Sequence, residues 1–332
     1  MLHLRCGSDI LDRLATAGLP GRAADWSDPL CDGPLEPWLD ESARRAARAP
    51  WIASRYGRDL AEVRSGLEVA DGWLSRAADE DEVVLWFEHD LFDQSILVYL
   101  LTRLEGLAPE RTSLICIGSH PEVPRFQGLG QLSAGQLAAL FPGREPVTAT
   151  RFETARRGWA ALAGADPRII QALVTEGTPE LPFLATALQR QLAEFPCVRN
   201  GLSLTEQLAL QGVMAGADRP RDIFEVVQRF EDAPWLGDTM LFAKLRLLTQ
   251  GPAPLLEPCG GAVPAVSDPG FLATRFELTL EGHLVMGGKA DWYQLCSPSQ
   301  WHGGVLLEGP EPVWRWDGRA NQLVAGGTRG VS

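Results

Sequence analysis

The sequence predicts a mixed α/β protein, and three patterns in its 332 residues support that fold class. Short apolar runs alternate with helical segments in the first 120 residues, as in a parallel sheet with crossover helices. Residues 131–200 carry helical periodicity almost throughout. Three further helical segments and then alternating segments complete the chain. We therefore expect a Rossmann-like α/β domain at 1–130, a helical connector at 131–200 and a winged-helix-like α+β domain with C-terminal strands at 201–332.

Four apolar segments of the N-terminal domain have the length of strands. They cover residues 2–6, 22–26, 83–87 and 113–117. The third has no polar alternation, as expected for a central parallel strand that is buried on both faces. Each run is followed by polar and mostly acidic residues. Because the carboxyl ends of parallel strands meet at one edge of a sheet, the sequence predicts a single polar pocket there.

Helices are predicted after the first two strands. Ser8 stands where it can cap a helix that ends at Gly18. Residues 36–77 are rich in Ala, Arg, Leu and Glu, and Pro50 and Gly57 interrupt them. This composition predicts two helices on the outer face of the sheet.

A helix is also predicted at about 91–104, after the third strand. Residues 119–132 contain two prolines and two glycines, which predicts a long loop. Loops of this length often act as lids over a site. The connector then has helical spacing in four segments, 134–141, 148–163, 167–175 and 181–194.

The C-terminal domain begins with a capping box, in which Ser203 precedes a helix and Glu206 stands three residues later. The predicted helices are 204–213, 220–230 and 238–248, and the predicted hairpin strands are 276–280 and 284–286. Three helices and then a hairpin is the order of a winged helix. Residues 305–307 and 313–316 predict antiparallel strands in the tail.

Composition restricts the partners of the protein. The net charge is −13, and residues 1–125 hold 22 acidic side chains against 13 arginines and no lysine. Such a surface repels nucleic-acid phosphates and anionic membranes. The six cysteines form no C-x-x-C pair, which favours reduced thiols over a zinc or disulfide framework. Without a long apolar span or a signal-peptide pattern, we expect a cytoplasmic protein.

The N-terminal region resembles an uncharacterised bacterial family known as domain of unknown function 1835. The string LWFEHDLFDQ at 85–94, the GSD turn at 7–9 and DPLCDGP at 28–34 carry the resemblance. The region after Ser203 is similar to a helical companion domain that often lies downstream of that family. The resemblance implies a Rossmann-like fold. It implies no particular reaction, because the family has no established chemistry. The positions that match the family are Asp9, Asp32, Asp93 and Gln94.

Glu88 and His89 are the candidate catalytic residues, because they lie between a buried strand and a helix. Carboxylates flank His89 on both sides, and a neighbouring carboxylate raises the pKa of a histidine and prepares it for acid/base work. A solvated loop histidine without a catalytic role is the alternative. Helix capping is the alternative for the next acidic residues. In that case Asp90 is the N-cap and Asp93 the third helical residue.

The turn at 7–9 lies where Rossmann proteins bind phosphate, but the G-x-G-x-x-G pattern is absent. Asp9 favours a hydroxyl, an amine or a divalent cation instead. If Asp28 and Asp32 face the crevice with Asp9, Glu88 and Asp93, these carboxylates require a cation. It is either a metal ion, at Asp9, Asp32 and Glu88, or the arginines of residues 41–58. Turn formation alone also explains Asp32.

These observations favour an enzyme-like module that binds a small polar metabolite at the sheet edge, with hydrolysis or group transfer assisted by a divalent cation. The ligand-binding candidates are Ser8, Asp9, Asp32, Asp93, Gln94, His120 and Arg125. One alternative is a ligand-sensing regulator or protein-interaction protein that uses the winged-helix-like domain, and another is a scaffold. Five basic against seven acidic residues at 200–250 disfavour DNA binding.

Overall fold

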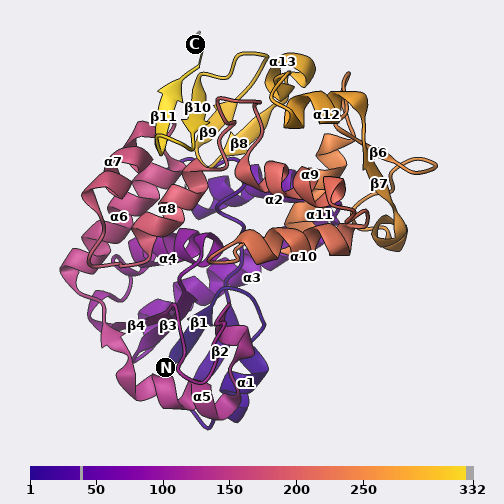
Figure 1. Cartoon of the computed structure of the whole chain (residues 1–332). Coiled ribbons are helices and arrows are strands. Elements are labelled where there is room, and N and C mark those ends of the chain that lie inside the picture. The colour runs from indigo at the N-terminus through magenta and orange to yellow at the C-terminus, as the bar shows by residue number, and fades with distance from the viewer. Residues whose placement is uncertain (38–39, 327–332) are drawn as a thin grey trace.

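The computed structural model describes residues 1–37 and 40–326 and shows a mixed α/β fold (Figure 1). A mostly parallel sheet has the strand order β2-β1-β3-β4-β5. Its strands are β1 (Leu2–Arg5), β2 (Arg22–Asp25), β3 (Val83–Glu88), β4 (Thr112–Ile117) and β5 (Glu145–Pro146). The four predicted strands are confirmed. The fifth was not predicted, because it pairs with β4 over only two residues and runs antiparallel to it.

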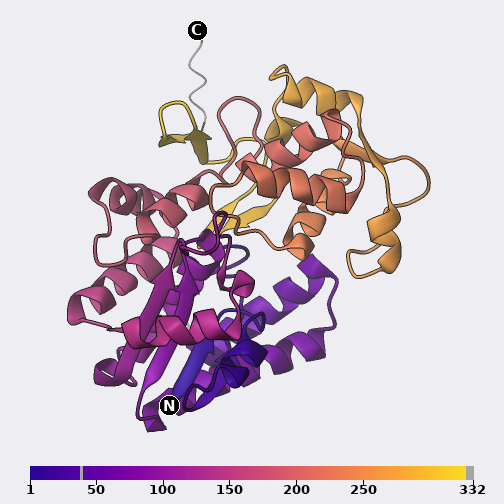
Figure 2. The same cartoon turned by 60° about the horizontal axis from the view of Figure 1, so that its bottom comes forward.

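The side chains of β3 alternate between two buried faces, which makes the sheet the middle layer of three. Val84 and Trp86 pack against apolar residues of α1 (Leu11–Thr16) and α5 (Ala134–Leu140). Val83, Leu85 and Phe87 belong to the core on the opposite face. That face is covered by α2 (Glu41–Tyr56), α3 (Leu60–Arg76) and α4 (Leu91–Leu104). Figure 2 shows α5 lying across one face of the sheet.

Two helix-end predictions need correction. Ser8 caps no helix, since α1 begins after Ile10 without a side-chain cap. Pro50 lies inside α2 and does not interrupt it. Burial of neighbouring residues such as Ala49 and Ile52 holds this helix together across the missing N–H group. Gly57 does end α2, with φ at +66° in the left-handed region.

The helical middle region is confirmed and packs beside α4. It contains α6 (Ala149–Ala163), α7 (Arg168–Glu176) and α8 (Leu184–Leu192). The three helices of the next region are confirmed as well. They are α9 (Leu204–Met214), α10 (Pro220–Phe230) and α11 (Asp238–Leu248). The capping box at Ser203 and Glu206 forms as predicted.

The predicted hairpin at 276–286 is wrong in its second half. β7 (Phe276–Leu278) pairs with β6 (Leu256–Pro258), and residues 280–286 form the helix α12 (Leu280–Met286). Thr279 caps α12 by accepting the N–H of Gly282. A side chain at 282 would place its Cβ 2.3 Å from the Leu255 carbonyl oxygen, so this glycine allows the helix to dock. Alternation over three residues did not distinguish a strand from a helix turn.

The tail forms short antiparallel pairs, as predicted. After α13 (Trp292–Cys296) come β8 (Gln300–His302) with β9 (Val305–Leu307), and β10 (Trp314–Asp317) with β11 (Gln322–Ala325). One contiguous apolar core extends from β1 to β10 through all three regions. All six cysteines are free thiols. In the part of the chain that the structure describes, every helix is too short or too polar to cross a membrane.

A buried ion network joins the loop after β2 to the outer helices. Asp28 is fully buried and accepts hydrogen bonds from Arg44 and Arg48 of α2. Arg44 also pairs with Asp71 of α3, at 2.7 Å. The arginines of α2 therefore neutralise Asp28 and Asp71. For Asp28, the expectation that these arginines supply the counter-ions is confirmed.

Replacement of Asp28 by Ala is expected to destabilise the protein by about 3–5 kcal/mol, because it leaves two buried guanidinium groups without their carboxylate. Urea unfolding measures the loss. Asp59→Ala is the control, since Asp59 is an exposed N-cap whose removal costs about 1 kcal/mol. Equal losses in the two variants would contradict this assignment.

Candidate functional site

The sheet changes winding direction between β1 and β3. From β1 the chain continues to β2 on one side, and it returns to β3 on the other side. In open α/β sheets, ligands bind outside the carboxyl ends of the two strands at such a point. Arg5 is the last residue of β1 and Glu88 is the last residue of β3. These two side chains define the first part of the candidate site.

Arg5 is the centre of a buried charge cluster at this sheet edge. Its Nη2 lies 2.5 Å from Glu88 Oε1, and its Nη1 lies 2.5 Å from Asp93 Oδ1. Its Nε lies 3.3 Å from Asp9 Oδ1. Asp9 is half-exposed, while the other three side chains are buried. The structure thus brings together three of the predicted acids around one guanidinium.

Arg5 was missed by the sequence reasoning, although a signal was present. It is the one charged residue of the apolar run at 2–6, and a charge in such a strand requires a buried partner. The arginines at 41–58 were expected to neutralise all the acids of the sheet edge. Arg44 and Arg48 do so for Asp28, whereas Arg5 binds Asp9, Glu88 and Asp93.

Capping and strand-end contacts occupy most of the remaining polar atoms. Asp90 is the N-cap of α4 and accepts the N–H of Asp93, so the capping role is confirmed for Asp90, whereas Asp93 also binds Arg5. Asp93 accepts the N–H of Glu88 at 2.7 Å and the Cys6 thiol at 2.8 Å. Gln94 donates to the Glu88 carbonyl at 2.5 Å. These contacts fix the junction between β3 and α4.

The loop at 119–132 covers this cluster. Leu129 is fully buried and donates its N–H to Glu88 Oε1 at 2.7 Å. Arg13 of α1 donates to the carbonyls of Gly130 and Leu132, at 2.7 and 2.6 Å. The predicted loop therefore closes over Glu88 and separates it from solvent.

Burial makes the cluster retain protons. Removal from water raises the pKa of Glu88 to about 8, and the charge of Asp93 adds to this effect. Burial also raises the pKa of Asp90 well above its ordinary value, again with Asp93 contributing. One guanidinium does not balance all the carboxylates, so proton uptake supplies the remaining positive charge.

The carboxylates do not form the predicted metal set of Asp9, Asp32 and Glu88. Oxygen atoms of Glu88, Asp90 and Asp93 lie within 4.8 Å of one another instead. The Arg5 guanidinium already contacts two of these three carboxylates. Arg5 therefore supplies the positive charge that the sequence led us to expect from a metal ion or from α2.

Among the described residues, the other predicted ligand residues make no hydrogen bond or ion pair with this cluster. Asp32 accepts a hydrogen bond from Tyr56 at 3.0 Å and lies 4.0 Å from Arg55. Ser8 is exposed in the turn after β1. His120 is half-buried and Arg125 is exposed in the 119–132 loop, and neither lines the groove described below. The grouping of these four residues around one ligand stays a prediction.

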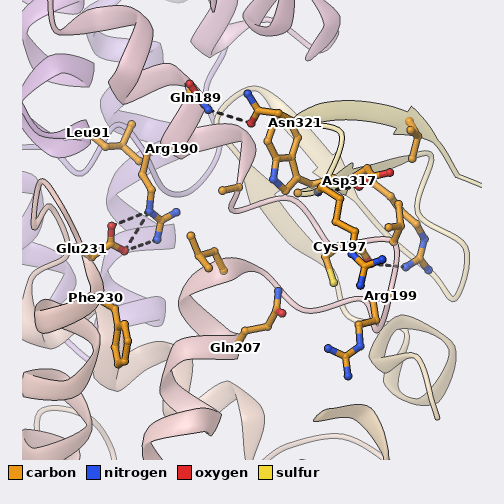
Figure 3. Close-up of a pocket in the computed structure, with 18 of the residues that line it drawn as sticks. Leu91, Gln189, Arg190, Cys197, Arg199, Gln207, Phe230, Glu231, Asp317 and Asn321 are labelled. Carbon is orange, nitrogen blue, oxygen red and sulfur yellow. Dashed lines mark hydrogen bonds and ion pairs between the residues drawn. The ribbon is translucent and has the colours of Figure 1, made fainter. Parts of the chain in front are cut away.

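A groove of about 1600 Å³ begins at the same sheet edge, on the side of His89, Asp90 and Leu91 (Figure 3). It continues between α8, the start of α9, the end of α10 and the β10–β11 pair. The sequence analysis did not predict that these segments form the far walls of the groove, because no local sequence pattern relates them to one another. Its charged lining residues beyond Asp90 are Arg190, Arg199, Glu231, Asp232, Lys289, Asp291, Glu311, Arg315, Asp317 and Arg319.

His89 is the predicted catalytic residue that reaches this groove. Its ring packs between Phe126 and Phe183, with centroid distances of 6.2 and 5.9 Å. Burial lowers the pKa of His89 below its ordinary value of 6.5, while Asp93 acts in the opposite direction. The expected rise was wrong because desolvation outweighs the neighbouring carboxylate. Its buried Nδ1 has no hydrogen-bond partner within residues 1–37 and 40–326.

One ion network fixes the groove wall opposite the β10–β11 pair. Arg190 of α8 binds Glu231 at 2.6 Å and Glu194 at 2.9 Å. Lys244 of α11 binds Glu194 as well, at 2.9 Å. Figure 3 shows the pair of Arg190 and Glu231 on this wall. The network joins α8, α10 and α11.

Comparison with known protein families gives no match for this chain, and comparison with curated proteins gives none either. The groove and the charge cluster therefore carry the functional assignment by their geometry and chemistry alone.

Gly128→Ala is expected to displace the loop, because the new Cβ would lie 2.4 Å from Glu88 Oε2. We expect a loss of about 1–3 kcal/mol in unfolding free energy and faster amide exchange at 119–132. Gly135→Ala in α5 is the control, since a Cβ there meets nothing within 4 Å. Unchanged exchange in Gly128→Ala would show that the contact with Glu88 does not hold the loop.

Stability is expected to fall as the pH rises from about 4.5 to about 8, owing to Glu88. In that interval the folded protein keeps a proton on Glu88 that the unfolded chain has released. The unfolding free energy then decreases by up to about 1.4 kcal/mol per pH unit. Glu88→Gln removes this proton and is expected to flatten the dependence in urea titrations across the interval. Identical slopes in both proteins would refute this interpretation.

Proposed function

We propose that the protein binds a polar small molecule in the groove at the carboxyl edge of the sheet and that His89 acts there as a general base. The observation that carries this proposal is the position of His89 at the end of β3, where the groove begins beside the switch point. Pockets for small ligands usually measure about 300–1000 Å³. The larger groove suits an extended molecule or two substrates side by side.

The chemistry favours hydrolysis or group transfer. A histidine with a lowered pKa is neutral near pH 7 and accepts a proton from a water or hydroxyl nucleophile. Glu88, the other catalytic candidate, does not line the groove and is enclosed by Arg5 and Leu129. We therefore assign Glu88 to positioning the junction of β3 with α4, and the proton transfer to His89.

Arg5, which contacts both Glu88 and Asp93, and the protons retained by Glu88 and Asp90 balance the charge cluster without the divalent cation expected from the sequence. The oxygens of Glu88, Asp90 and Asp93 remain close enough for a cation to compete with Arg5. Cation binding at this position would require the guanidinium to move.

The order β2-β1-β3-β4 with intervening helices supports a Rossmann-like interpretation of the N-terminal region, in line with the resemblance to domain of unknown function 1835. A regulator is the second candidate, because α9, α10 and α11 are followed by the antiparallel pair of β6 and β7. Lys244 of α11 is buried and paired with Glu194, so it is not available to phosphates. This favours a protein contact over DNA for the C-terminal region.

His89→Gln tests the proposal. We first screen polar metabolites for a rise in melting temperature of the full chain and then measure turnover of those that bind. The variant is expected to lose turnover by about 10²–10⁴-fold with unchanged stability. The wild-type rate is expected to fall as the pH drops through a value below 6.5, because protonation removes the base.

The matched control is His283→Gln, since His283 is exposed on α12 and does not line the groove. Full turnover in His89→Gln would exclude His89 as the base. If no polar metabolite raises the melting temperature, the binding function itself fails.

A further inference from the structure

We propose that the β8–β9 hairpin is a local pH switch, which stays docked while His302 is neutral and opens when this ring takes up a proton. His302 is the last residue of β8, and its side chain is buried in the interior of the protein. It does not line the groove. The inference therefore goes beyond the function proposed for His89 and does not depend on it.

The hairpin turns one face of its two strands toward the rest of the protein. Gln300 and His302 of β8 pair with Leu307 and Val305 of β9, and all four residues are buried. Within the described residues, these two strands form a sheet of their own. A backbone hydrogen bond joins the turn to α6, from the N–H of Gly304 to a carbonyl at 2.9 Å. Docking of the hairpin thus depends mainly on its buried side chains.

The His302 ring is enclosed without a partner for a second proton. It stacks on Phe195, with ring centroids 4.8 Å apart and an angle of 28° between the ring planes. Its buried Nε2 makes no hydrogen bond within residues 1–37 and 40–326. A charged imidazolium donates from both nitrogens, and a buried donor without an acceptor is costly. The docked hairpin therefore favours the neutral ring.

The charges that act on His302 come from four other segments. Lys244 of α11 and Arg55 of α2 are the cations, and Glu194 after α8 and Asp32 after β2 are the acids. A proton on the ring would be repelled by both cations. It would be stabilised only if one of the acids could turn its carboxylate to the ring.

Both acids are already engaged. Glu194 binds Arg190 and Lys244, each at 2.9 Å. Asp32 accepts a hydrogen bond from Tyr56 at 3.0 Å. A proton on the ring would therefore add a positive charge to the interior, while these two carboxylates are held by other donors.

One more acid borders the hairpin from α9. Glu206 accepts a hydrogen bond from Gln300 at 3.4 Å, and it also accepts the N–H of Ser203 at 2.8 Å in the capping box. These contacts direct its carboxylate to neighbours other than the histidine.

Proton uptake is thus linked to opening of the hairpin. Burial and then the charge of Lys244 lower the pKa of His302 to about 4 in the docked state. In an open hairpin, where the ring is hydrated, it regains its ordinary value of 6.5. As the pH falls from 6.5 to about 4, the open form binds a proton that the docked form does not. The equilibrium then shifts toward opening by up to about tenfold per pH unit.

Hydrogen exchange of the full chain at about pH 7.5 and about pH 5 tests the switch in peptides that cover residues 298–309. After correction for intrinsic exchange rates, the opening constant of the hairpin is expected to rise by about tenfold or more at the lower pH. The pair of β6 and β7 is the internal control, because it contains no histidine. An unchanged opening constant at 298–309 would overturn the proposal. An equal rise in both pairs would also overturn it, since it would indicate global opening.

His302→Phe keeps a ring against Phe195 but takes up no proton, so it is expected to abolish the pH dependence. His302→Gln is a second neutral variant and serves if the phenylalanine prevents folding. The matched control is His283→Gln, which is expected to keep the response of the wild type because His283 is exposed on α12. A folded neutral variant that opens at low pH as the wild type does would contradict the switch. So would an NMR titration in which the His302 ring takes up its proton at the ordinary value of 6.5.

Discussion

The guanidinium of Arg5 is the constraint on which the N-terminal site depends. It lies at the end of β1 and contacts Glu88 at the end of β3 and Asp93 in the first turn of α4. A buried cation requires carboxylate partners, and the buried carboxylates require a cation, so each fixes the others. The 119–132 loop joins this arrangement through the N–H of Leu129. These contacts set the direction in which the β3–α4 junction presents His89.

The groove begins where that junction ends. His89 is held between Phe126 and Phe183, so its ring is half-buried where the groove begins. Farther along, Arg190 joins Glu231 to Glu194 and ties together helices from two regions of the chain. The groove therefore has a half-buried histidine where it begins and a fixed ion network on one wall.

Local sequence patterns were sufficient to predict most of the helices and strands. The unbroken apolar run of β3 indicates a strand buried on both faces, and the Ser203 capping box marks the start of α9. Asp90 and Asp93 stand at the spacing that caps α4. Errors arose where short elements depend on distant partners. Residues 284–286 form a helix because α12 docks on the Leu255 carbonyl through Gly282, and β5 exists only through its pairing with β4.

The sequence by itself determined the parallel strands, the order of the helices and the polar character of the sheet edge, since hydrophobic periodicity and capping act over a few residues. Only the tertiary structure decided which charges meet. Asp32 and Asp9 both come after strands of the same sheet, yet Asp32 contacts Tyr56 while Asp9 faces Arg5. Burial lowers the pKa of His89. The aromatic rings that bury it belong to segments far away in the chain, so the residues around His89 did not predict the direction of this shift. Ion pairing and desolvation are set by distances in space, which residue spacing does not specify.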